Sequence, residues 1–513
     1  MDKYSEVQSA VESLKSTVEM SLEKVKDCAS GYTMDTIVYK KESIPFPKEI
    51  EETAQDEGHA GLIEGVSSVW AANRGKLVIW NYNTHMINEI ETKTQKVQAV
   101  FAIKPGNDIF TSNVQHCILL FTETSASMMC LCKSPVAYIS MDITVDLPVV
   151  MTCVCETDDG RVFMGGADGN IYEFVYKESS WLKGYSAKIV SHTHGVMAHI
   201  LPFLYAMGHK PAIKQMVTTY KGMLVLFEDN TLEAYELKKY LKKIRTADLP
   251  ELNTKHHIQL VKVDRRSYSA YLILPDATRI FLDDNAYAIG KRPMPSTRIR
   301  SRLATHSTIK NERFYQIGKN LVSIGQKDSD PVITIIISNQ KDTASPENCC
   351  TVIAGAEYTH VAPSGRKHAP NLAESLIVGE EVAFLAPNKV DLYHIMNGVE
   401  LMERACTNPE GMFAFIQRNG PEQALISALY AVSEGAVSPA IDSLFKKTEG
   451  LQKKSISMCA ATFIYKIWNV DIYAILKEDI GIDVSEYIEE VDSAIKKTRK
   501  LKNFVIRECT SIN

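Results

Sequence analysis

The sequence predicts a mainly β protein with added α-helices: a seven-bladed β-propeller followed by the beginning of an α-helical solenoid. Two observations lead to this fold class. One hairpin pattern recurs seven times between residues 61 and 396, and from residue 397 onward the apolar residues recur at helical spacing. A unit repeated at intervals of 42 to 69 residues indicates a propeller, whose blades usually take roughly 40–50 residues with room for insertions.

Size and composition agree with a large folded intracellular protein. A chain of 513 residues is too long for one ordinary hydrophobic core, so two or more structural units are expected. The 62 acidic and 57 basic residues give a net charge of −5, which argues against a dedicated nucleic-acid binder. No apolar run approaches the roughly 20 residues of a membrane-spanning helix, and the N-terminus has no apolar signal-peptide core. The 11 scattered cysteines predict reduced thiols, not a secreted disulfide framework.

The first 60 residues are predicted to form two elements. Residues 1–30 are predicted to be an amphipathic helix, because apolar residues fall every three or four positions along one stripe. These residues are Tyr4, Val7, Val11, Leu14, Val18, Leu22 and Val25. Such a stripe is expected to pack on the propeller or on a partner. Residues 31–60 are predicted to be a linker, since the Ile44-Pro45-Phe46-Pro47 step favours extended backbone.

Residues 61–396 are predicted to form the propeller. Each repeat consists of a short apolar strand, a polar turn and a second strand that carries a large residue. The clearest turns are Arg74-Gly75, Ala167-Asp168-Gly169, Glu228-Asp229-Asn230 and Pro387-Asn388, and turns of this composition between apolar strands are typical of β-hairpins. The large residues are Trp80, Phe174, Tyr235 and Tyr393 in these copies, and Leu131, Leu282 and Ile324 in three weaker ones. An irregular β-sandwich or two smaller barrels is the alternative, but neither repeats one hairpin at this period.

Residues 397–513 are predicted to form the α-helical part. Stretches such as PEQALISALYAVSEG and SPAIDSLFKKTEG are apolar at helical spacing. Pro421 suits a first helical turn, and Gly435 and Gly450 suit helix ends. Short helices with tight connections are typical of an α-solenoid; a simple helical cap is the alternative.

The sequence offers no candidate catalytic, cofactor-binding or metal-binding site. It contains no P-loop, nucleophile elbow or zinc-protease motif. His192, His194 and His199 lack a cysteine or acidic residue at ligand spacing, which favours ordinary loop histidines over a metal site. Two basic runs, at 238–245 and 291–302, are expected to be solvated faces more than contacts with lipid or nucleic acid. We therefore expect neither an enzyme nor a small-molecule substrate.

Several motifs resemble those of the large inner-ring scaffold nucleoporins of the nuclear pore complex. In order along the chain they are IPFPKEI at 44–50, LVIWNY at 77–82, TDDGRVFMGGADGNIYEFVY at 157–176 and GMFAFIQRNGPEQALISALY at 411–430. The resemblance runs from about residue 5 to residue 450, and the segment 152–176 is its most specific part. Members of this family usually continue through a far longer solenoid.

The resemblance implies a structural scaffold component of the inner ring, located in the nuclear envelope and supporting nucleocytoplasmic transport of protein and mRNA. It implies other inner-ring nucleoporins, linker nucleoporins and the nuclear membrane surface as partners, and no specific nucleic acid. A vesicle-coat or tethering subunit is the alternative function, because such proteins also join propellers to solenoids. The quoted motifs favour the pore.

Residues 189–209 are the candidate membrane contact. This segment has no Asp, Glu, Lys or Arg in a chain that is 23% charged, and it falls in the 61-residue interval between the third and fourth hairpins. It is too short to span a bilayer but able to lie in its surface, and the matching loop of similar nucleoporins is where such a contact would be expected. The candidate membrane-binding residues are Val196, Met197, Ile200, Leu201, Phe203, Leu204 and Tyr205. A buried strand plus loop is the alternative, since short apolar runs are more often core.

Overall fold

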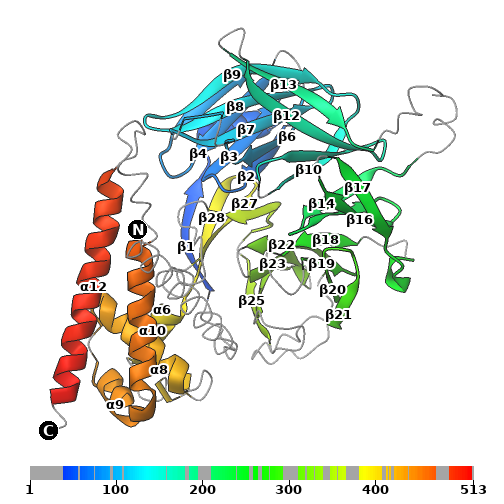
Figure 1. The fold of residues 1–513 in the computed structure, drawn as a ribbon. Helices are drawn as coiled ribbons and strands as arrows, with labels where there is room; N and C mark the ends of the chain where they lie inside the picture. Colours follow the sequence, from blue (N-terminus) through cyan, green and yellow to red (C-terminus); the bar gives the residue numbers. More distant parts are fainter. Residues whose placement is uncertain are drawn as a thin grey trace, which may run out of the picture.

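The computed structural model is a ring of seven four-stranded antiparallel sheets with a group of helices beside it (Figure 1). The seven-bladed propeller expected from the repeats is confirmed. The structure describes residues 38–510 apart from residues 56–57, 74, 93–95, 107–108, 112, 158, 180–183, 194–209, 239, 254–257, 264–268, 276–277, 293–309, 318–319, 328–329, 339–346, 355, 365–379, 407–411, 414, 417–420, 437 and 469–483. The predicted helix at 1–30 therefore lies outside the described residues.

Each blade is one sheet of consecutive strands. Blade one contains β2 (His59–Ile63), β3 (Ser68–Asn73), β4 (Lys76–Asn81) and β5 (Ile87–Glu91). Blade two contains β6 (Val97–Ile103), β7 (Val114–Thr122), β8 (Ser125–Lys133) and β9 (Val136–Asp146). Blade three contains β10 (Met151–Glu156), β11 (Val162–Gly166), β12 (Ile171–Ser179) and β13 (Gly184–Ser191). Blade four contains β14 (Ile213–Thr218), β15 (Gly222–Phe227), β16 (Leu232–Leu237) and β17 (Leu241–Thr246). Blade five contains β18 (Gln259–Lys262), β19 (Ala270–Ile273), β20 (Arg279–Leu282) and β21 (Ala288–Arg292). Blade six contains β22 (Lys310–Ile317), β23 (Asn320–Lys327), β24 (Asp330–Ser338) and β25 (Glu347–Ile353).

The seventh blade closes the ring with strands from both ends of the propeller. It contains β26 (His360–Pro363), β27 (Glu380–Ala386), β28 (Lys389–Ile395) and, as its outermost strand, β1 (Val38–Pro45). β1 runs antiparallel to β28, from Val38 opposite Ile395 to Pro45 opposite Lys389. The linker expected at 31–60 is thus wrong over residues 38–45, which form a strand, and over residues 48–54, which form a short helix; residues 31–37 lie outside the described residues. Because only Val38 and Ile44 of this outer strand are buried, it lacks the alternation that reveals a strand in the sequence.

Apolar clusters between neighbouring blades hold the ring together. β4 illustrates the arrangement, since Val78 and Trp80 pack toward blade seven while Leu77 and Ile79 pack toward blade two. The same alternation continues around the ring, and each adjacent pair of blades shares one buried cluster. A closed ring also leaves only the outer strands unpaired, which limits edge-to-edge association.

The repeat pattern located six of the seven hairpins correctly and one incorrectly. Six of the large marker residues lie on the third strand of their blade, as Phe174 does on β12. Ile324 instead lies on β23, the second strand of blade six. The sixth hairpin is therefore the β22–β23 pair, one strand earlier than in the other copies.

The helices pack against the seventh blade. α6 (Gly398–Cys406), α8 (Pro421–Glu434), α9 (Pro439–Lys447), α10 (Glu449–Trp468) and α12 (Val484–Thr510) follow the propeller, and the short α2 (Lys48–Ala54) and the 3-10 turn η1 (Pro250–Leu252) lie within its connections. Asn397 accepts the backbone N–H groups of Val399 and Glu400, while Glu400 accepts that of Asn397. This capping box begins α6 two residues after the last propeller strand.

Proline and glycine mark two of the three expected helix boundaries. Pro421 is the first residue of α8, and Gly435, at φ +117°, follows its last residue. Gly450, expected at a helix end, instead lies in the first turn of α10. Leu501 and Phe504 of α12 share one buried cluster with Val38 of β1 and Tyr393 of β28, so the helices and the closing blade have a common core.

Candidate interaction site

The predicted membrane-binding residues, Val196 to Tyr205, lie outside the described residues, as do His194 and His199. The two ends of their segment are described. Thr193 precedes it at the end of blade three, and Lys210 follows it shortly before blade four. Both ends meet the same turn, between β11 and β12.

The turn between β11 and β12 is rigid and holds both ends of the segment. Asp168 accepts the backbone N–H and the side-chain amide of Asn170, and it accepts the Tyr172 hydroxyl at 2.6 Å. The hydroxyl of Thr193 donates to Asn170 Oδ1 at 3.1 Å and accepts the backbone N–H of Ile171 at 2.8 Å. Residue 193, where the segment departs, is therefore fixed to blade three by two hydrogen bonds.

Gly169 allows Lys210 and Pro211, at the other end of the segment, to lie close to the turn. Its φ is +75°, in the left-handed region that favours glycine. A Cβ atom built at this position would lie 2.5 Å from Cβ of Lys210 and 2.6 Å from the carbonyl oxygen of Pro211. The absence of a side chain thus allows the returning chain to pass directly over the turn.

Replacing Gly169 by valine should destabilise the third blade and displace the returning chain. We expect a loss of about 1–3 kcal/mol from backbone strain, to which the close contact with Pro211 adds. Thermal unfolding would measure the effect, with Gly160→Val as a comparison: Gly160 also has a positive φ, but its added Cβ would meet no atom within 4 Å. Equal melting temperatures for the parent and Gly169→Val would contradict the close approach.

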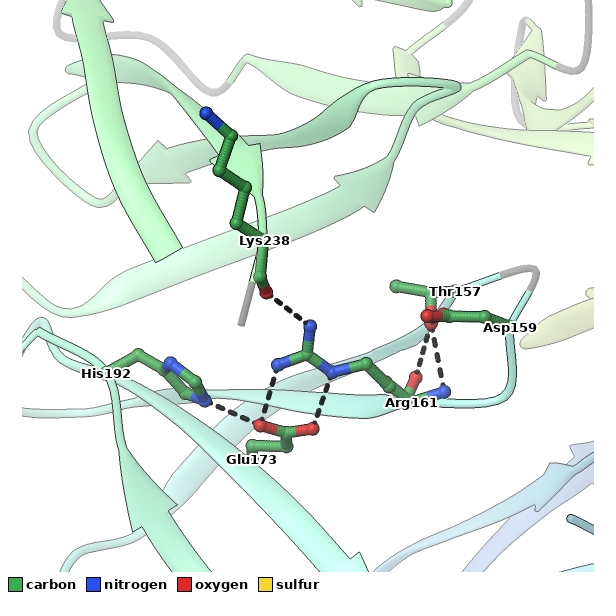
Figure 2. Close-up of polar contacts among 6 residues, drawn as sticks. All are labelled: Thr157, Asp159, Arg161, Glu173, His192 and Lys238. Carbon is green, nitrogen blue, oxygen red and sulfur yellow. Dashed lines mark hydrogen bonds and ion pairs between the residues drawn. The ribbon is translucent and has the colours of Figure 1, made fainter. Parts of the chain in front are cut away.

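A charged network crosses blade three, from the turn before β11 to the residue that follows β13 (Figure 2). Arg161 donates from Nε and Nη2 to the two carboxylate oxygens of Glu173, at 2.7 and 2.9 Å. Nε2 of His192 lies 2.6 Å from Glu173 Oε2, and the His192 side chain is only 2% exposed. Arg161 Nη1 also donates to the backbone carbonyl of Lys238 at 2.7 Å, so this side chain connects blade three to blade four.

The turn before β11 positions Arg161. The hydroxyl of Thr157 accepts the backbone N–H of Arg161 at 2.9 Å, and Gly160 adopts a φ of +81°. Burial opposes ionisation of Glu173, but the hydrogen bonds from Arg161 and His192 outweigh it and lower the pKa of this carboxyl to about 2. Glu173 is therefore an anion at neutral pH, balanced by the bidentate guanidinium.

These residues can hold blades three and four in place, but their described contacts show no arrangement that would make or break a covalent bond. Both carboxylate oxygens of Glu173 already accept hydrogen bonds from Arg161, and one of them also lies next to His192. Within the described ranges, no group of three or more His, Cys, Asp or Glu residues could hold a metal ion. Among the described helices, none is long and apolar enough to cross a membrane. His192 lies in the bend just after β13, as expected for a loop histidine, and its side chain is buried against Glu173.

Sequence reasoning singled out the motif at 157–176 without assigning its roles. The structure assigns the threonine and glycine to the turn, Arg161 and Glu173 to the ion pair, and Asp168, Gly169 and Tyr172 to the segment's base. A threonine and an arginine four residues apart across a glycine could have indicated the side-chain-capped turn.

The basic runs are described in part. Residues 241–245 lie in β17, where Lys243 pairs with Glu233, and Lys238 just before it pairs with Glu236 at 3.0 Å. Of the run at 291–302, only Lys291 and Arg292 fall in the described part, at the end of β21. The first run ends on β17 and the second begins on β21, the outer strands of adjacent blades.

Comparisons with known proteins agree on one kind of molecule. Residues 35–251 match the nucleoporin family model described as Nup133 N-terminal-like. The chain is 27% identical over 194 residues to the nuclear pore complex protein Nup154 of Drosophila melanogaster, which covers 34% of the chain and 14% of that protein. It is 28% identical over 192 residues to the probable nucleoporin C890.06 of Schizosaccharomyces pombe, covering 35% of the chain and 14% of that protein. These matches thus span about a seventh of each relative's length.

A solved structure shares the fold over almost the whole chain. It is the Nup170 N-terminal domain of Chaetomium thermophilum in complex with Nup53, with a TM-score of 0.70 and 14% identity, covering 96% of this chain and 86% of that one. At this identity the likeness concerns the fold.

Proposed function

We propose that the chain, whose relatives support a large nucleoporin with an N-terminal β-propeller, is a structural scaffold of the inner ring of the nuclear pore complex. Its relatives indicate a location at the nuclear pore complex, and family and fold together point to a structural protein without enzymatic activity. As a scaffold it supports nucleocytoplasmic transport by binding and geometry alone.

The observation that carries the proposal is the construction of blade three. The residues that match the family motif at 157–176 form no reactive site; they fix two blades and both ends of the segment 194–209 in place. Rigid connections between blades suit a scaffold, because preorganised residues lose less entropy when a partner binds. The tagged full-length protein should give a punctate nuclear rim. Cytoplasmic vesicles instead would favour a coat or tethering subunit.

We infer two further parts of this role from the fold. The helices that follow the propeller share a core with its closing blade, which suits the start of an α-solenoid that continues a rigid frame. The similar Nup170 domain was solved with Nup53, and we propose that this chain likewise binds linker nucleoporins and neighbouring inner-ring subunits.

We also propose that the charge-free segment 194–209 contacts the nuclear membrane surface. The described residues on either side of it, Thr193 and Lys210, both lie against the β11–β12 turn, and its apolar residues suit insertion at the headgroup level. The parent should float with small, highly curved liposomes, and Leu201→Asp/Phe203→Asp should not. The matched control Leu201→Ile/Phe203→Leu keeps the apolar character and should float. Equal flotation of the folded aspartate variant, or none of the parent, would contradict the proposal.

A further inference from the structure

The outer rim of blades four and five carries exposed apolar and cationic side chains side by side. Ile244 on β17 is 44% exposed and Ile289 on β21 is 49% exposed, while Tyr287, just before β21, is 56% exposed. The guanidinium of Arg245 lies over the Tyr287 ring, with Cζ 3.8 Å from the ring centroid. We call Lys242, Ile244, Arg245, Tyr287 and Ile289 the rim patch. It belongs to the blades across the ring from the helices (Figure 1).

Both outer strands are bulged at the exposed isoleucine. In β17, Lys243 pairs with Tyr235 and Arg245 with Ala234, which leaves Ile244 without a partner in the register. In β21, Ala288 pairs with Leu282 and Gly290 with Phe281, which leaves Ile289 without one. Bulges in edge strands hinder the addition of a further strand and redirect a side chain. A partner of this surface would therefore be recognised by side chains, not by extension of the sheet.

Hydrogen bonds in the turn before β21 fix the position of the Arg245–Tyr287 pair. Asp283 Oδ1 accepts the backbone N–H groups of Asn285 and Tyr287, at 2.9 and 2.8 Å, and the Asp283 N–H donates to the Tyr287 carbonyl. This turn fixes Tyr287, and the tyrosine ring in turn orients the guanidinium. Tyrosine and arginine are enriched among the residues that dominate binding energy, and fixed side chains lose little entropy on binding.

The positive charge of the rim patch indicates which kind of partner would bind there. Lys243 and Lys238 are paired with Glu233 and Glu236, but Lys242 and Arg245 form no ion pair with any described residue. Two cations without an acidic partner among the described residues, beside two exposed isoleucines, complement a segment that combines acidic with bulky apolar residues. A nucleic acid would need more phosphate-binding cations and more aromatic platforms than the patch offers. A membrane would need a larger cationic cluster.

We propose that the rim patch is a docking site for a short acidic segment with aromatic or aliphatic residues in a partner protein. The inference rests on the proposed scaffold function in expecting a protein partner. It concerns a surface on blades four and five, separate from the blade-three residues described above, so the two can fail independently.

Binding of a synthetic probe to the full chain tests the proposal. The probe is a fluorescent peptide that alternates Glu and Asp with Phe and Leu, and its counterpart carries Lys in place of the acids. We expect the acidic peptide to bind at least about tenfold tighter than its counterpart, and Arg245→Glu and Tyr287→Ala each to weaken it about tenfold. Lys188→Glu, the same charge change at an exposed lysine on the outer strand β13, should leave the affinity within about twofold.

Two further arms separate the other classes of partner. Vesicles containing phosphatidylserine and a short DNA duplex are measured with the same variants, and Arg245→Gln replaces Arg245→Glu if the latter lowers the melting temperature. Equal affinity for both peptides, or for the parent and the rim variants, would overturn the proposal. So would Arg245-dependent binding of vesicles or DNA without binding of the acidic peptide. None of these results changes the expected nuclear-rim location.

Discussion

Deleting residues 1–45 should abolish cooperative folding of the propeller, because it removes the strand that closes the ring. Asp391 on β28 is fully buried and is contacted from β1 by Lys40 Nζ at 2.8 Å and by the Ser43 hydroxyl. Burial alone would raise the pKa of Asp391, but the bonds from Lys40, Ser43 and Tyr358 outweigh it and lower the pKa below its ordinary value. Without β1, the partners that Asp391 retains among the described residues are Lys389 at 3.4 Å and the Tyr358 hydroxyl at 2.7 Å.

The size of this effect follows from two losses. Removing one partner of a buried ion pair costs about 3–5 kcal/mol, and exposing the apolar surface around Val38 and Ile44 adds about 1.5–3 kcal/mol for each side chain. Together they are comparable with the whole stability of a typical domain, about 5–15 kcal/mol. Thermal and urea unfolding followed by circular dichroism should therefore show no sharp transition.

Deletion of residues 1–37 is the matched control for this experiment. It leaves every described contact of β1 intact, so the ring should unfold cooperatively as in the full chain. If both deletions unfold at the same midpoint, β1 does not close the ring as the structure indicates. A third variant, Asp391→Asn, would show how much of the effect arises from the buried charge.

The hairpin repeat predicted the propeller well because it reports local chemistry. Turns such as Ala167-Asp168-Gly169 and the apolar strands beside them are fixed by neighbouring residues, so the sequence contains the full signal. Blade six departs from the pattern because the Gly318-Lys319 step between β22 and β23 resembles a hairpin turn as well as the later connection does. A local signal can therefore count blades correctly while assigning one hairpin to the wrong pair of strands.

The closing strand could not be predicted in the same way. β1 pairs with residues about 350 positions later in the chain, and its exposed lysines and glutamate give no alternation. The partners of Arg161 posed a similar problem. The bond to the Lys238 carbonyl crosses from one blade to the next, and His192 approaches Glu173 only because β12 and β13 pair side by side. Such contacts depend on the register of distant strands, which no short motif records.

Replacing Arg161 by leucine should be the most destabilising single substitution in blade three. It leaves Glu173, whose side chain is 11% exposed, with His192 as its remaining described side-chain partner, and it removes the bond to blade four. Breaking a buried pair on one side costs about 3–5 kcal/mol. The double variant Arg161→Leu/Glu173→Leu removes both charges and should recover much of that loss, since a buried pair exchanged for apolar residues is often nearly neutral. Chemical unfolding of the two variants measures the difference.

Acid unfolding provides an independent check on the same pair. The pKa of Glu173 is lowered to about 2 in the folded protein, against an ordinary value of about 4.3. Its contribution to stability is therefore fully present above the ordinary pKa and is lost as the pH falls from about 4.3 toward 2. Arg161→Leu raises the folded pKa, so the loss of stability across this window should be smaller in the variant than in the parent. If the double variant is no more stable than Arg161→Leu, or if acidification from pH 5 to pH 2 destabilises the parent and Arg161→Leu equally, the ion pair does not hold Glu173 in its charged form.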